Sequence, residues 1–240
     1  PIFHLCCHCP APLPPPSPKR PPIGYSVRVL RKSSYLVLML LLIVTIQVAI
    51  NLVDYEYKLF LNEAFTVIDP STGEGVLKTA EMTSFRGKVN SAINLVALLL
   101  QLASGPLLAA LGIGRVLMAI PILLMIAFGV FAATPRLLTI AIAKVTSKSL
   151  DYSLFRAAKE VLYIPLSYEE KTRGKAVIDI MVYRIGKAGA AILILGVTAT
   201  ELGWLVTLTT FGVVAAWIGL TWLIVRRYQS VNAVPDKEQN

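Results

Sequence analysis

The sequence predicts an all-α membrane protein that crosses the bilayer with six helices. Apolar side chains make up 55% of its 240 residues, and the mean hydropathy is +0.67. A soluble domain does not have enough polar surface to cover so much apolar material. The apolar residues also gather into runs of about 18 or more, the length that a helix needs to cross the hydrocarbon layer.

Five of the six spans follow from these apolar runs. The remaining one, Arg136 to Ile164, is amphipathic, but it lies between two short connections and must cross if its neighbours are to keep consistent sides. The expected spans cover residues 35–60, 86–111, 114–133, 136–164, 174–199 and 202–225. They form one unit over residues 35–225, between a lead of residues 1–34 and a tail of residues 226–240.

The distribution of Lys and Arg predicts how these spans are oriented, because cytoplasmic connections retain positive residues. Basic residues gather before the first span, at Arg115, around Arg173 and after the last span, whereas acids such as Glu56 and Glu63 are assigned to the opposite side. Both ends of the chain are therefore expected to be cytoplasmic. The net charge of +9 is partly topological, and since no soluble basic domain carries it, nothing indicates nucleic-acid binding.

The lead of residues 1–34 differs in composition from the rest of the chain. It is rich in proline between Pro10 and Pro22, and it has neither the apolar core nor the cleavage site of a secretory signal. The run from Cys6 to Cys9 lacks the usual ligand spacing of a zinc site, so we expect no metal. A lead of this kind in a chain that starts without Met favours a piece of a longer protein whose upstream half is missing.

Charged residues inside the expected spans are the strongest functional signal. A charge at bilayer depth costs at least about 2.5 to 3.5 kcal/mol, so a cluster of charges indicates a wet pathway for a charged solute. Helical spacing aligns polar side chains on one face of four spans. The aligned sets are Gln47, Asn51, Asp54 and Lys58; Arg86, Asn90, Asn94 and Gln101; Lys144, Lys148, Asp151, Phe155 and Lys159; and Lys175, Asp179, Tyr183 and Lys187.

Structural pairing is the alternative explanation for these charges, because acids and bases within a membrane also lock helices together. The fourth and fifth spans nevertheless keep a positive excess after pairing, and unpaired cations require an anion or water. Asn90 and Asn94 are also compatible with simple interhelical hydrogen bonding, and Gly186 and Gly189 with close helix packing. A scaffold without transport activity would have every cation matched to an acid and no cavity.

Motifs of soluble enzymes are absent or weak in the sequence. Arg173-Gly174-Lys175 lacks the upstream glycine of a phosphate loop, and His4 and His8 both lie in the lead, which excludes a histidine-based triad. We therefore expect neither an enzyme nor a protein with a resident cofactor.

One block of residues resembles the ATP/ADP translocases of plastids and obligate intracellular bacteria. It consists of Ser147-Lys148-Ser149, Tyr152 to Phe155, Lys159-Glu160 and Tyr163 to Leu166, followed by Lys171-x-Arg173-Gly174-Lys175-Ala176-x-Ile178-Asp179 and Gly186-Lys187-x-Gly189. Asn51 to Asp54 also resembles the first span of the second half of that family. The resemblance implies a twelve-span, major-facilitator-like transporter that exchanges nucleotides, with this chain as its C-terminal six-span half.

The resemblance and the charged stripes together predict a carrier that exchanges ATP for ADP by alternating access. By position, Asp54, Lys159 and Lys187 match charged residues of the family. The expected partners are the nucleotide, the lipid bilayer and the missing N-terminal half, in a bacterial inner membrane or a plastid envelope. Asp151 and Arg156-Ala157 depart from the family pattern, which leaves a major-facilitator relative for another organic anion as the alternative. The expected substrate-binding residues are Asp54, Lys148, Arg156, Lys159, Asp179, Arg184 and Lys187.

Overall fold

The computed structural model describes residues 33–68, 75–166, 175–200 and 202–232 of the chain. Of these residues 89% are helical, so the all-α class is confirmed. The lead of residues 1–32, with its cysteine run, lies outside the described residues.

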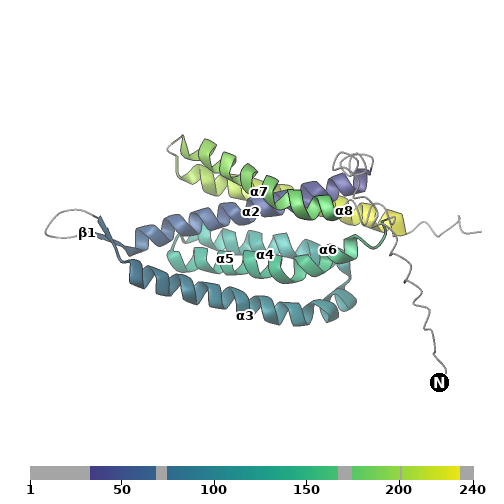
Figure 1. The fold of residues 1–240 in the computed structure, drawn as a ribbon, viewed down its shortest axis with the longest axis horizontal. Coiled ribbons are helices and arrows are strands. Elements are labelled where there is room, and N and C mark those ends of the chain that lie inside the picture. Colours follow the sequence, from purple (N-terminus) through teal and green to yellow (C-terminus); the bar gives the residue numbers. More distant parts are fainter. Residues whose placement is uncertain (1–32, 69–74, 167–174, 201, 233–240) are drawn as a thin grey trace, which may run out of the picture.

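The elements follow one another as long helices with one small hairpin. With the labels of Figure 1, their order is α2 (Ser34–Phe65), β1 (Thr66–Ile68), β2 (Gly75–Leu77), α3 (Thr79–Leu111), α4 (Ile113–Ala133), α5 (Leu137–Leu150), the π-helical turn η1 (Asp151–Phe155), α6 (Arg156–Leu162), α7 (Lys175–Thr198) and α8 (Trp204–Asn232). Because α5, η1 and α6 are contiguous, they make one helical rod.

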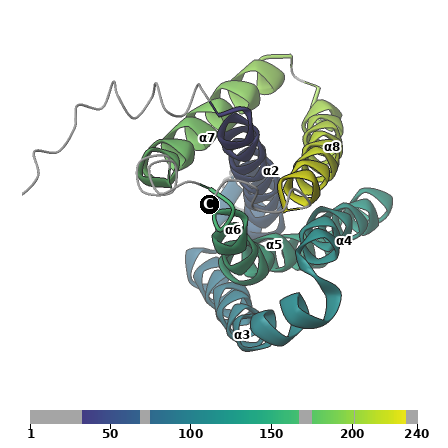
Figure 2. The same cartoon turned by 90° about the vertical axis from the view of Figure 1, so that its right-hand side faces the viewer.

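The helices run back and forth along the long axis of the molecule, and α2 lies at the centre of the bundle (Figures 1 and 2). α2 packs against α5, α7 and α8, while α4 packs against α5 and α8. Leu36, Met39 and Leu42 of α2 are fully buried, as are Leu117 and Phe128 of α4. The N-terminal half of α2 is apolar around most of its circumference, and a helix of this kind is expected to be buried among others, which agrees with the central position of α2.

The connections on either side of α4 are short and show clear stop signals. α3 ends at Leu111 and is followed by Gly112, whose φ of 77° lies in the left-handed region that favours glycine. α5 begins after Pro135, where the backbone N–H of Arg136 donates to the Thr139 hydroxyl at 3.2 Å. Between α2 and α3, β1 and β2 pair as an antiparallel hairpin with Thr66 opposite Leu77, a feature that the apolar patterning did not predict.

Four of the described helices are long and apolar enough to cross a membrane: α2, α3, α4 and α8. The rod of α5, η1 and α6 carries several charged residues, and neither it nor α7 is among these four. Six crossings thus stay a prediction. Glu56, which the loop-charge pattern assigned to the outer side, lies inside α2 and is only 3% exposed.

Candidate functional site

A polar pocket of about 350 Å³ lies between α2, α3 and α5. Three of the polar stripes expected from helical spacing converge on it, because each of the three helices turns its polar face toward the same space. Its lining residues are Asp54, Asn90, Ile93, Asn94, Lys144, Lys148 and Tyr152.

Asp54 forms the electrostatic centre of this pocket. Its Oδ1 lies 2.7 Å from Nζ of Lys144 on α5, and its Oδ2 lies 2.9 Å from Nζ of Lys58, one turn further along α2. The side chains of Asp54 and Lys144 are 22% and 12% exposed, whereas Lys58 is 56% exposed. The interhelical pair with Lys144 is therefore the better shielded of the two and connects α2 to α5.

Lys144 and Lys148 add positive charge one turn apart on α5. Nζ of Lys144 lies 3.8 Å from the centroid of the Tyr57 ring, a distance at which the ring face attracts a cation. Lys148 lies 6.0 Å from the Tyr152 ring and has no salt bridge in the part of the chain that the structure describes. With one acid against these two lysines and Lys58, the pocket has a net positive charge.

The π-helical turn η1 begins directly after Leu150, the last residue of α5, and carries a second acid. Asp151 lies beside Gln47 of α2, within electrostatic range of Lys148, Arg156 and Lys159. Ser149, just before the turn, donates a hydrogen bond of 3.2 Å to the carbonyl of Ile93 on α3. This contact fixes the end of α5 against the wall of the pocket.

The seven expected site residues do not all meet in one place. Asp54 and Lys148 line the pocket, and Lys159 is buried at 8% exposure on α6 near Asp151. Arg156, Arg184 and Lys187 are exposed. The side chain of Asp179 lies outside the described part of α7.

Lys144, Asn90 and Asn94 line the pocket but are not among the expected substrate-binding residues. Lys144 belongs to the polar stripe of the fourth span, and the sequence is compatible with interhelical hydrogen bonding by the two asparagines. Their spacing with Arg86 was the available signal, since it placed them on one polar face. Nothing in the sequence indicated that Tyr57 would pack against Lys144, because this contact joins residues of two different helices.

Comparison with known proteins identifies the relatives of this chain. Residues 123–228 match the family model of the TLC ATP/ADP transporters. ADP,ATP carrier protein 1 of Chlamydia trachomatis is 26% identical over 90% of this chain and 44% of its own length. The plastidic ATP/ADP-transporter of Solanum tuberosum is 30% identical over 70% of this chain and 28% of its own length.

The chain spans less than half the length of these curated carriers, and no solved structure matches it. The match to the carriers covers their C-terminal part. The resemblance to the ATP/ADP translocases is therefore confirmed, and the chain is a relative of these carriers that corresponds to the C-terminal part of their length.

Proposed function

We propose that this chain is the C-terminal, six-span, major-facilitator-like half of a carrier that exchanges ATP for ADP by alternating access. The observation that supports this most is the net positive pocket around Asp54, Lys144 and Lys148, in a relative of the ATP/ADP transporters. Nucleotides carry several negative charges on their phosphates, and a low-dielectric pocket with an excess of lysines over acids is suited to bind them.

The exposed cations of α6 and α7 support the presence of a second half that covers the face formed by α3, α6 and α7. Arg184 and Lys187 are exposed on α7, and Arg156 is exposed on α6. Lipid chains do not solvate such charges, so at bilayer depth they would require a wet cavity. A second six-span unit facing α3, α6 and α7 would enclose that cavity, and together with Asp54, Lys148, Lys159 and Asp179 these cations would bind the substrate.

The Asp54–Lys144 pair suggests how exchange would be enforced. Asp54 neutralises Lys144 at 2.7 Å, and we propose that bound phosphate oxygens take over part of this role. A carrier without nucleotide would keep the positive excess of the pocket and of the exposed cations uncompensated while it reoriented, which is costly, so it would change sides mainly with a nucleotide bound. Neither a metal nor a cofactor enters this scheme.

A carrier for another organic anion is the alternative, and the charges of η1 and α6 favour it. The ATP/ADP translocases carry other residues at the positions of Asp151 and Arg156. Asp151 also brings a negative charge close to Lys148. Competition experiments discriminate between the two functions. In a carrier that exchanges ATP for ADP, unlabelled ATP and ADP should each reduce the uptake of labelled ATP. In a carrier for another organic anion, neither nucleotide should reduce the uptake of that anion.

Uptake of radiolabelled ATP by proteoliposomes that hold the complete carrier, this chain together with its second half, tests the proposal. Lys148→Gln removes one cation from the pocket and should weaken nucleotide affinity about ten- to a hundredfold, since a charge-assisted contact contributes roughly 1.5–3 kcal/mol. Lys78→Gln is the control, because Lys78 is half exposed beside Glu81 next to the hairpin. Equal affinities in the two variants would contradict nucleotide binding in this pocket.

A further inference from the structure

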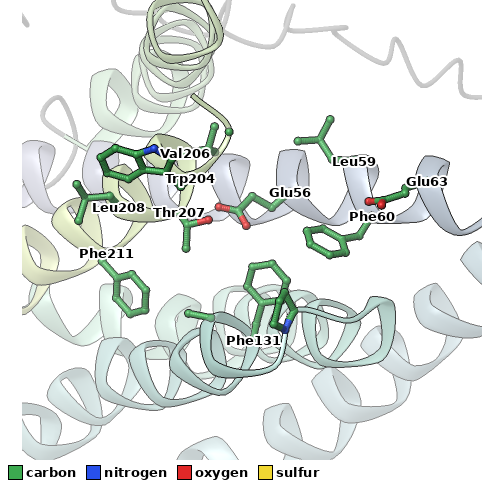
Figure 3. Close-up of a pocket in the computed structure, with 13 residues that line it drawn as sticks. Glu56, Leu59, Phe60, Glu63, Phe131, Trp204, Val206, Thr207, Leu208 and Phe211 are labelled. Carbon is green, nitrogen blue, oxygen red and sulfur yellow. The ribbon is translucent and has the colours of Figure 1, made fainter. Parts of the chain in front are cut away.

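A second and larger cavity, of about 830 Å³, lies at the hairpin end of the bundle between α2, α4 and α8. Its walls are mostly apolar and include Phe60, Phe131, Trp204 and Phe211 (Figure 3). Its volume is in the range of cavities that hold small organic ligands. It is separate from the polar pocket, with which it shares no lining residue.

One carboxylate inside this apolar cavity is only partly satisfied. Glu56 is 3% exposed, and Figure 3 shows its carboxylate directed toward the α8 side of the cavity, next to Thr207. The Thr207 hydroxyl lies close enough to this carboxylate to interact with it electrostatically. Oε1 of Glu56 has no hydrogen-bond partner among the described residues. A buried polar atom without a partner is costly, which points to a group that the cavity is built to receive.

The charge of the cavity defines what this group would be. Glu56 and Glu63 are the only charged residues among those that line it, and both are acidic. They lie seven residues apart on α2, so they share one face of the helix. An anion is disfavoured here, whereas a cation with an apolar body would match both the carboxylate and the aromatic walls.

We propose that this cavity binds an amphipathic amine, with a protonated ammonium group at Glu56 and an apolar body against the aromatic side chains. An ammonium group offers N–H donors to the free oxygen of Glu56. Trp204, at the start of α8, is 60% exposed, and tryptophan is enriched where the hydrocarbon layer meets water. A ligand with one charged and one apolar end is suited to that level of the membrane.

The chemistry allows two sources for the amine: an aminophospholipid from the bilayer or a soluble amine. Binding is measured on the full chain in phosphatidylcholine nanodiscs, through quenching of tryptophan fluorescence by a bromoalkylamine. The bromoalkyl alcohol of the same length is the reference ligand. In the unchanged chain the amine should bind at least about tenfold more tightly than the alcohol, because only the amine makes a charge-assisted contact. Equal affinities would overturn the proposal without any variant.

Two isosteric variants locate the contact. Glu56→Gln should weaken amine binding about tenfold or more and leave alcohol binding unchanged. Glu63→Gln, at an exposed position of the same cavity, should weaken amine binding by less than about fivefold, as expected for a solvent-screened charge. Undiminished amine binding in Glu56→Gln would overturn the proposal.

Nanodiscs with equal amounts of phosphatidylethanolamine and phosphatidylcholine distinguish the two sources. If the aminophospholipid is the ligand, it should compete with the bromoalkylamine and reduce the quenching. If the soluble amine is the ligand, quenching should be the same in both kinds of nanodisc. This assay involves no nucleotide, so its failure would be distinguishable from a failure of the proposed transport function.

Discussion

Gly186 of α7 lies directly against Gln47 of α2. A Cβ atom built on Gly186 would stand only 2.6 Å from Cβ of Gln47, and 3.5 Å from the carbonyl oxygen of Val44. Real side chains do not approach so closely, so α7 can occupy its place on the central helix only with glycine at this position. The expectation that Gly186 serves close packing is confirmed by this contact.

Gly186→Ala should therefore destabilise the bundle by about 1–3 kcal/mol, the usual cost of overpacking a tight contact. Gly189→Ala is the matched control on the same helix, because its Cβ would lie at an ordinary 3.8 Å from Val48. We expect that change to be neutral or stabilising by up to about 1 kcal/mol. Unfolding in detergent, followed by circular dichroism, measures both, and equal stabilities would contradict the contact.

The pair of Asp54 and Lys144 should show strong coupling in a double-mutant cycle. Asp54→Asn leaves Lys144 without its carboxylate and Lys144→Gln does the reverse, whereas the double change removes both charges. We expect a coupling free energy of unfolding of about 1–3 kcal/mol, because both side chains are largely shielded. Lys58→Gln, at a mostly exposed partner of the same carboxylate, should change stability by less than about 0.5 kcal/mol.

Lys187 tests whether the exposed cations of α7 bind substrate. Lys187→Gln should weaken uptake of radiolabelled nucleotide by the complete carrier about ten- to a hundredfold, since it removes one charge-assisted contact. Melting temperature should stay unchanged. If Lys187 instead only neutralises Asp179, the double change Lys187→Gln with Asp179→Asn should restore most of the uptake, and that rescue would assign Lys187 to structural pairing.

Cysteine labelling tests the predicted orientation in the membrane. In a chain whose native cysteines are replaced by serine, Val76→Cys marks the hairpin and Ser230→Cys marks the end of α8. Val76 is 53% exposed and Ser230 is exposed, so both should react with an impermeant maleimide. We expect Val76→Cys to react only from outside and Ser230→Cys only from the cytoplasm. Labelling of the hairpin from the cytoplasmic side alone would contradict the topology.

Hydropathy predicted the helices well because long apolar segments have few alternatives to a helix in a membrane. Hydropathy alone did not indicate the amphipathic segment between Arg136 and Ile164; that helix followed from the requirement that neighbouring spans keep consistent sides, and the structure shows helix there as α5, η1 and α6. Hydropathy also did not indicate the hairpin, whose strands of three residues each are exposed and too short to show a period.

The candidate site was predictable only in part. The spacing of polar residues correctly placed Asp54 and Lys148 on faces that now line one pocket. It did not identify Lys144 as the partner of Asp54, because that contact depends on how two distant helices dock. The regular stripe along the fourth span is also interrupted, since the π-helical turn adds a residue at η1 and rotates α6 relative to α5.

The guanidinium of Arg227, near the end of α8, donates a hydrogen bond of 2.8 Å to the hydroxyl of Ser34, the first residue of α2. The start of the first described helix and the end of the last one thus contact each other at one end of the bundle (Figure 1). A second unit of the same kind, joined at either terminus by a short linker, would enter the membrane from the same side. The two units would then be parallel repeats related by an axis along the membrane normal, and an inverted repeat would need an additional crossing.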